Sequence, residues 1–447
     1  MAKRLFAAFL FIILAGAFWT PAQAQGPAAA PTAHVEVAQL PPAGVAHFDQ
    51  QKAVDAYVAR LSPKDRARSD AYFEGGYVLQ VVDVIYVLAV AGLLLWLHIS
   101  ARMRNIATKI TRFRFLQAPI YVVQYVVITT VLSLPLTIYE GFIREHAYGL
   151  SNQTFMQWAR DFGVQFLVSL VAFTVLLTVI YAVARKVQQN WWVWATGISV
   201  AFMVFFIMIA PVYISPLFNN YTPLPDSAMK STILSMARSN GIPADNVYTF
   251  DASKQSKRVS ANVSGIFGTT RISLNDNLLN RCTPSEVLAV LGHEMGHYVM
   301  NHVGILVTWF GLLILVGFWF IDRAFHGLVR VFGKQWDVES LGDPAGLPLV
   351  MALFSVFFFF ATPISNTIVR THEIQADIFG LNVARQPDAF ATSALKLAEY
   401  RKLDPTPLEE FVFYDHPSGR NRIMEAMRWK AEHINDPDIM AGPISPQ

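Results

Sequence analysis

Six apolar segments of membrane-spanning length constrain the fold of this chain more than any other feature. They run roughly over residues 78–98, 117–139, 164–184, 191–213, 303–322 and 347–366. An α-helix needs about 20 consecutive apolar residues to cross a bilayer, and helices satisfy their own backbone hydrogen bonds there. Of the 447 residues, 53% are hydrophobic and only 15% are charged, whereas soluble domains carry about 25% charged residues. The sequence therefore predicts a mainly α-helical, polytopic membrane protein and excludes a soluble or a disordered chain.

The N-terminal 24 residues are typical of a secretory signal peptide. Lys3 and Arg4 precede an apolar run over 5–19, and a small-residue cleavage motif ends at Ala24. The alternative is an uncleaved anchor, although the run is short for a full span. Residues 25–61 are rich in alanine and proline without helical or strand periodicity, and we expect a flexible exported linker there.

The rest of the chain alternates between membrane and polar regions. We predict a four-span transmembrane region over 62–213, a polar region over 214–302, a transmembrane hairpin over 303–366 and a second polar region over 367–447. The first polar region shows a helical pattern over 226–239. It also shows three short strand patterns, over 247–250, 259–266 and 271–274. A small β-sheet beside a helix is therefore expected.

Basic residues in short loops predict the orientation of the spans, because cytoplasmic loops carry an excess of Lys and Arg. The loops of one side hold ten such residues: Arg102, Arg104, Lys109, Arg112, Arg114, Arg185, Lys186, Arg323, Arg330 and Lys334. The loop over 140–163 on the other side holds only Arg144 and Arg160. We therefore expect a multi-pass inner-membrane protein whose two polar regions face the periplasm.

Charge and cysteine content narrow the chemistry. The formal net charge is +3, and nucleic-acid binders concentrate Lys and Arg far more strongly, so a nucleic-acid partner is not expected. Cys282 is the only cysteine, which excludes an intrachain disulfide and a cysteine-based metal site. Metal ligands would have to be His, Asp or Glu.

Residues 293–297 read HExxH, and this motif carries the strongest chemical signal. Positions i and i+4 of a helix share one face, so His293 and His297 can bind one metal ion while Glu294 points to a water on that ion. Thr283 and Glu286 form a capping box with a proline at the first helical position. We therefore predict a helix over 284–302 that presents the motif.

A catalytic zinc takes three protein ligands and keeps one position open. The hairpin over 303–366 brings the residues before its first span to the depth of those after its second, so Glu373 can complete the site. Asp377, one turn later, can accept from a histidine ligand. The alternative interpretation of Glu373, without the hairpin argument, is a solvated surface charge beside Arg370. His302 is expected at the interface or behind the ligands, and His372 is expected to face elsewhere.

Two histidines, one carboxylate and a free glutamate indicate hydrolysis. Zinc lowers the pKa of its water and polarises a carbonyl, while Glu294 moves the proton to the leaving amine. A polar cluster downstream can supply a donor for the oxyanion; it consists of Tyr414, Asp415, His416 and Arg422. One zinc ion per chain is expected.

Taken together, these stretches resemble the type I CAAX prenyl protease family and related bacterial quality-control proteases. Residues 211–224 look like its IxPLFNxxxPL segment, and Leu288–His297 look like its AVLGHExGH helix. Residues 366–377 resemble its NxxxRxxExxAD motif, and 416–422 resemble its HPxxxxR motif. Residues 251–254 and 271–279 resemble the turn before its substrate-binding strand and the strand that follows. The resemblance runs from about residue 140 to 425.

The resemblance implies a gluzincin-type zinc protease domain, formed by the two polar regions, with Glu294 as base. It implies that His416 and Arg422 are donors to the substrate and the transition state, and that Asn366 and Arg370 lie with Asp377 behind the ligands. Where the family has Asn-Ala on its substrate strand, this chain has Ser260 and Ala261, with Asn262 next. Ser260 and Asn262 are therefore the candidates for binding substrate.

These observations predict a membrane-embedded zinc endopeptidase. Resemblance implies prenylated CAAX substrates, whereas an exported signal makes the clipping of membrane proteins or lipopeptides an equal alternative. The alternative from another class is a transporter or binding scaffold in which the HExxH helix is structural. The expected partners are a peptide or lipidated peptide and the bilayer; the oligomeric state is not predicted.

Overall fold

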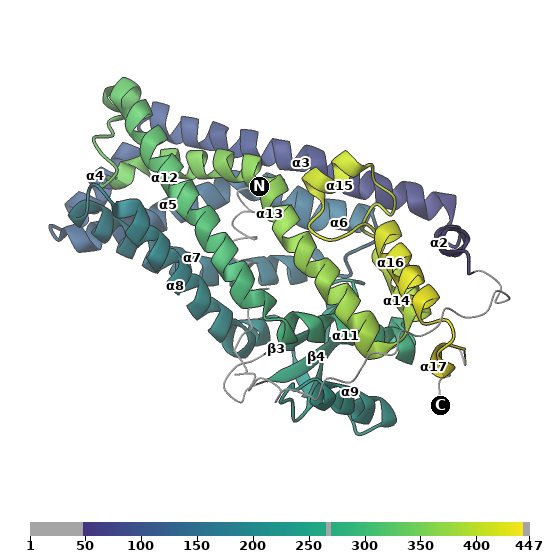
Figure 1. The fold of residues 1–447 in the computed structure, drawn as a ribbon. Helices are drawn as coiled ribbons and strands as arrows, with labels where there is room; N and C mark the ends of the chain where they lie inside the picture. The colour runs from purple at the N-terminus through teal and green to yellow at the C-terminus, as the bar shows by residue number, and fades with distance from the viewer. Residues whose placement is uncertain (1–47, 265–269, 441–447) are drawn as a thin grey trace, which may run out of the picture.

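The computed structural model describes residues 48–264 and 270–440, and most of them form long helices with a small sheet at one end (Figure 1). The predicted signal peptide and the first part of the predicted linker lie outside the described residues. The predicted fold class, mainly α-helical with several spans and a small sheet, is confirmed.

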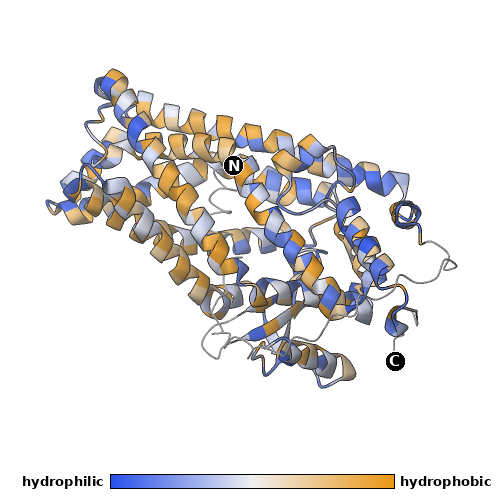
Figure 2. Ribbon diagram, viewed as in Figure 1, coloured by the Kyte–Doolittle hydropathy of each residue, from blue (hydrophilic) through white to orange (hydrophobic). Residues whose placement is uncertain are grey.

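Within residues 48–264 and 270–440, six helices are long and apolar enough to cross a membrane, and each contains all or most of one of the six predicted segments. They are α3 (Pro63–Trp96), the run α5–η1–α6 (Arg114–Ala147), α7 (Phe155–Lys186), the run α8–η2–η3 (Trp191–Leu217), α12 (His302–Trp336) and the run η5–α13 (Pro344–Ala384). Several extend well beyond the apolar segment; α13 continues to Ala384 as one helix. Hydrophobic residues cover these helices over much of their length, whereas the start of α3 is hydrophilic (Figure 2).

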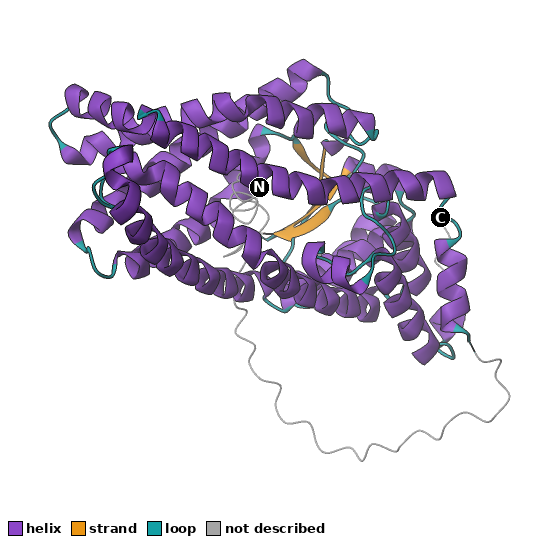
Figure 3. Cartoon of the chain, turned by 90° about the horizontal axis from the view of Figure 1, so that it is seen from above, coloured by secondary structure: helices purple, strands orange, loops and turns teal. Residues whose placement is uncertain are grey.

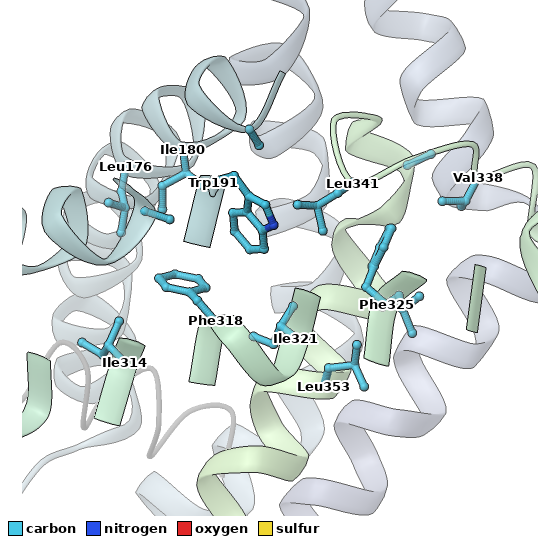
Figure 4. Close-up of a cluster of buried hydrophobic side chains, with 14 of the residues drawn as sticks. Leu176, Ile180, Trp191, Ile314, Phe318, Ile321, Phe325, Val338, Leu341 and Leu353 are labelled. Atoms are coloured by element: carbon cyan, nitrogen blue, oxygen red, sulfur yellow. The ribbon is translucent and has the colours of Figure 1, made fainter. Parts of the chain in front are cut away.

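The spans pack around a core of large apolar side chains (Figure 4). Trp191 at the start of α8 meets Phe318 of α12 edge-on, with ring centroids 5.5 Å apart. The Trp191 indole donates a hydrogen bond to Asp322, so the one polar atom of this ring is satisfied. Other apolar side chains of the same helices point outward, and Val171 (65% exposed) and Phe360 (73% exposed) are examples. Such an exposed apolar surface fits contact with lipid.

The remaining elements lie between and beyond the spans. Helix α4 follows the first span, α9 to α11 accompany the sheet, and α14 to α17 follow α13. Their bounds are α4 (Ile99–Ile110), α9 (Ala228–Ser239), α10 (Asp276–Arg281), α11 (Pro284–Val299), α14 (Pro387–Leu397), α15 (Pro407–Phe413), α16 (Gly419–Glu432) and α17 (Pro437–Met440).

In the part of the chain that the structure describes, four strands form one sheet in the order β1-β2-β4-β3, which lies among the helices (Figure 3). Their bounds are β1 (Tyr221–Pro223), β2 (Val247–Phe250), β3 (Ala261–Ser264) and β4 (Arg271–Asn275). Strand β3 pairs with β4 in antiparallel fashion and is an edge strand. The three predicted strands correspond to β2, β3 and β4, and the short β1 was not predicted.

Helix α2 (Gln50–Val58) corrects the prediction of a flexible linker over 25–61, at least for its last part. Asp49 caps the helix, and Val54 and Tyr57 are buried against α14 and α16. The Tyr57 hydroxyl donates to Asp388 at 2.6 Å. Two buried apolar side chains three residues apart were too short a pattern to stand out within an alanine-rich segment.

Docking of α2 can be tested with Val54→Asp. Burying a valine contributes about 1.5–3 kcal/mol, and an unpaired buried carboxylate costs more, so α2 should detach. A loss of about 2 kcal/mol makes the open form about 30-fold more populated. Trypsin should therefore cleave after Lys52 and Arg60 about 30-fold faster in detergent-purified protein. Ala56→Asp, on the exposed side of the same helix, should cleave at the wild-type rate; equal rates for both variants would contradict docking.

Candidate active site

Helix α11 presents the HExxH motif as predicted, but it is shorter. Thr283 accepts from the backbone of Glu286 and the Glu286 side chain accepts from the backbone of Thr283, so the predicted capping box is present. The helix predicted over 284–302 ends at Val299. Asn301 then adopts a left-handed conformation with φ 59°, and α12 begins at His302. The motif helix and the span are therefore two helices joined by a sharp turn.

Glycines let α11 cross α13 at backbone contact. A Cβ added at Gly380 would lie 2.7 Å from the His293 nitrogen, and one added at Gly292 would lie 2.9 Å from the Gly380 oxygen. One turn on, a Cβ at Gly296 would lie 3.1 Å from the Ala376 Cα. Any larger side chain at these positions would separate the helices. The close crossing places the imidazoles of α11 directly opposite the carboxylates of α13.

The three predicted metal ligands converge. His293 Nε2 lies 3.1 Å from His297 Nε2 and 3.3 Å from Glu373 Oε2, and His297 Nε2 lies 3.5 Å from Glu373 Oε1. Their ligand atoms all lie within 4.8 Å of one another, an arrangement that can hold a metal ion. Glu373 Oε2 is buried and forms no hydrogen bond with a described residue. A cation between these atoms would satisfy the carboxylate and both ring nitrogens, so the residues fit a metal.

Asp377 supports His293, as predicted, because its Oδ1 lies 2.6 Å from His293 Nδ1. Arg422 was predicted to contact substrate. Instead it donates two hydrogen bonds to the Asp377 carboxylate, from Nε at 2.9 Å and from Nη2 at 2.5 Å. Both side chains are buried. Arg422 therefore acts behind Asp377: it compensates the buried carboxylate, which in turn orients the imidazole.

Glu294 and His416 complete the surroundings of the three ligands. Burial raises the pKa of the Glu294 carboxyl from its usual value, against the opposing effect of His293 and His297. His416 Nε2 lies 3.2 Å from Glu373 Oε2, and its Nδ1 lies 2.8 Å from Asp415. The predicted polar cluster downstream therefore does reach the site through His416.

Asn366 and Arg370 lie on α13, but they do not stand behind the ligands as predicted. Asn366 donates to the Val412 carbonyl at 2.8 Å, and Arg370 donates to the carbonyls of Glu410 and Tyr414. These bonds fix the end of α15 and the segment that leads to His416. Both side chains therefore position the loop that carries His416.

Strand β3 lies against α11, and no strand of the described residues pairs with its outer edge. The Asn275 N–H donates to the Ser260 carbonyl, and this bond sets the phase of the antiparallel pair. By alternation, the backbone groups of Ala261 and Val263 point away from β4. Ser260 itself is exposed and Asn262 is partly buried. The outer backbone edge, rather than either predicted side chain, is what this strand most directly offers to an extended peptide.

Comparisons with known proteins match this architecture. The model of peptidase family M48 matches residues 223–430, and that of the CAAX prenyl protease N-terminal region, described as five membrane helices, matches residues 46–220. The chain is also 35% identical over 345 residues to an uncharacterised metalloprotease, YhfN, of Bacillus subtilis. The aligned region covers 77% of this chain and 79% of that protein. The chain belongs to peptidase family M48. The resemblance noted from its motifs is confirmed, and it begins near residue 46 rather than 140.

Other relatives agree with this assignment. CAAX prenyl protease 1 of Saccharomyces cerevisiae is 28% identical, over 66% of this chain and 69% of that protein. The crystal structure of S. mikatae Ste24p shares the fold with a TM-score of 0.67 at 23% identity, over 85% of this chain and 94% of that one. This M48 member is therefore a membrane metalloendopeptidase, and the scaffold alternative loses its support.

The crossing of α11 and α13 predicts the effect of Gly380→Ala. The added Cβ meets the backbone of His293 at 2.7 Å, so the helices must shift apart and the ligands with them. A displacement of about 1 Å costs about 100-fold in rate, and we expect at least that loss of peptidase activity together with reduced metal content. Gly327→Ala on α12, where an added Cβ meets nothing within 4 Å, is the matched control. Normal metal content and activity in Gly380→Ala would show that the crossing tolerates separation.

Proposed function

We propose that this protease uses a single zinc ion held by His293, His297 and Glu373. The observation that carries the proposal is the convergence of two ring nitrogens and one buried carboxylate, whose ligand atoms all lie within 4.8 Å of one another. The donor set contains no sulfur, and two imidazoles with one carboxylate are the ligands of the thermolysin type of catalytic zinc. A zinc ion bound there would supply a Lewis acid that polarises the scissile carbonyl and makes an attacking water more acidic.

The residues around the ligands then provide proton transfer and stabilisation of the oxyanion. Glu294 accepts the proton of the attacking water and delivers it to the leaving amine, a role that a partly shielded carboxyl suits. In its protonated form, the His416 ring donates from Nδ1 to Asp415 and from Nε2, which stands beside Glu373, to the oxygen that becomes negative. Asp415 holds the opposite ring nitrogen, so the imidazole is oriented before substrate arrives.

The substrate is an extended peptide that pairs with the outer edge of β3. The backbone groups of Ala261 and Val263 hydrogen-bond to it, while Ser260 and Asn262 flank it and contribute side-chain contacts. Pairing through the backbone does not require a specific sequence. This mode suits an endopeptidase that accepts several substrates.

The active site faces the periplasm of the inner membrane. Helix α12 begins at the HExxH end of the molecule and carries Arg330 and Lys334 in its last two turns, at its opposite end. The site therefore lies at the end opposite the basic loops, which remain in the cytoplasm by the positive-inside rule. On this side, membrane proteins or lipopeptides are better candidate substrates than the prenylated CAAX ends suggested by the names of the relatives.

Glu294→Gln tests the role of the base. The substitution keeps the size of the side chain but removes its basicity, so hydrolysis should fall by about 10²–10⁴-fold while zinc content stays at one per chain. The assay uses detergent-purified protein with a quenched peptide, offered unmodified, acylated and farnesylated. A rate that survives the substitution contradicts the mechanism, and preference among the three peptides separates the candidate substrates.

Glu373→Ala tests the metal site itself. Loss of one of three ligands should remove most of the zinc found by elemental analysis after dialysis, together with all activity. Glu339→Ala is the control, because that exposed carboxylate lies beyond the far end of α12 from the site. Full zinc content in Glu373→Ala would assign the third ligand to another residue.

A further inference from the structure

The two histidines of the HExxH motif have different partners behind them. His293 Nδ1 faces the carboxylate of Asp377 at 2.6 Å. His297 Nδ1 faces another imidazole, His302 Nδ1, at 2.9 Å. No carboxylate of the described chain takes that place for His297. Histidine ligands usually donate to a carboxylate, a carbonyl or water, so an imidazole acceptor needs an explanation.

The direction of the hydrogen bond follows from the position of the metal site. His297 Nε2 is the nitrogen that faces His293 and Glu373. It must be unprotonated to bind a cation, so the neutral ring carries its proton on Nδ1. His297 therefore donates, and His302 Nδ1 must accept. His302 in turn is neutral, with its own proton on Nε2.

The turn between α11 and α12 is what brings His302 to this place. On a continuous helix, residues five apart point about 140° away from each other, so His302 could not reach His297. Asn301 breaks the helix with a φ of 59°, and its side chain accepts from the Gly304 backbone to start α12. The chain therefore folds back, and the first residue of the span lies directly behind the metal ligand.

His302 is held in a dry setting. It is 1% exposed, and its ring meets the ring of His372 edge to face, with centroids 4.9 Å apart. His372 is fixed by its Nδ1, which lies 2.7 Å from the Ile368 carbonyl. His302 Nε2 has no geometric hydrogen-bond partner among the described residues; besides His297, the polar side chains that act on this ring are His372, Gln375 and Glu373. Water cannot readily replace the acceptor that His302 provides.

We propose that His302 is a positioning residue that fixes the tautomer and orientation of His297 for zinc. The inference rests on the proposed metal site and extends it. Asp377 already brings a negative charge behind His293, and Arg422 compensates it. A second carboxylate behind His297 would add an uncompensated charge in a buried place. A neutral imidazole instead supplies the acceptor without that charge.

The experiment measures zinc affinity of the full chain in detergent, by competition with a chromophoric chelator. His302→Asn keeps an acceptor, because its Oδ1 stands where the Nδ1 of histidine stands. His302→Phe keeps the buried ring and removes the acceptor. Loss of such a partner typically costs 10–100-fold in metal affinity; we expect that loss for His302→Phe and a change within about 3-fold for His302→Asn. A residue that only fills space would be served at least as well by Phe, so equal affinities of the two variants would overturn the proposal.

Two further measurements keep the outcome clear. His326→Phe, on the same helix and far from the site, should bind zinc like the wild type. The visible spectrum of the cobalt-substituted protein should be retained in His302→Asn, whereas loss of a nitrogen ligand there would make His302 a metal ligand and overturn its positioning role. If His302→Phe does not fold, His302→Leu takes its place in the comparison.

Failure of this inference can be told apart from failure of the metal site. Glu373→Ala is measured in the same series. If it retains zinc, the proposed ligand set is wrong. If it loses zinc while His302→Phe binds zinc as tightly as the wild type, the ligand set stands and only the role of His302 falls.

Discussion

The backbone contact between α11 and α13 is the constraint on which the site depends. Gly292 on one helix and Gly380 on the other leave no room for a side chain between them. Because the helices touch, His293 and His297 face Glu373 and Asp377 at bonding distance instead of across a layer of apolar side chains. Small residues at a helix crossing are common in membrane bundles. Here small residues at the crossing bring the candidate metal ligands together just beyond the apolar segment of α13.

Continuity of α13 links that site to the bilayer. A single helix from Leu347 to Ala384 carries the last span and then both carboxylates. On the other side of the hairpin, α11 is not continuous with its span, because Asn301 interrupts it. Helix α13, which carries the carboxylates, is therefore a rigid extension of a membrane helix. The orientation of α11, which carries the histidines, is set by the turn at Asn301. The turn allows the motif helix to lie across α13, and it also places His302 behind His297.

The sequence revealed the spans, the motif helix and the ligand set, since each rests on a local pattern or on simple topology. Six apolar runs define six helices, and a hairpin must return Glu373 to the depth of His297. The sequence did not reveal the role of Arg422, because its grip on Asp377 depends on how α16 packs against α13. Nor did it reveal α2 or the contact between Gly292 and Gly380. The role of a nine-residue helix or of two glycines depends on the elements that pack against them, and the sequence does not show those contacts.

Helix α2 also shows how the second half of the site is held. Val54 and Tyr57 share one apolar cluster with Ile423, the neighbour of Arg422 on α16. The Arg420 side chain, on the same helix, donates to Asp55. Helix α2 therefore stabilises the helix that supports Asp377, which orients His293. Residues that precede the first span by sequence thus belong, by contact, to the part of the molecule that keeps the metal ligands in register.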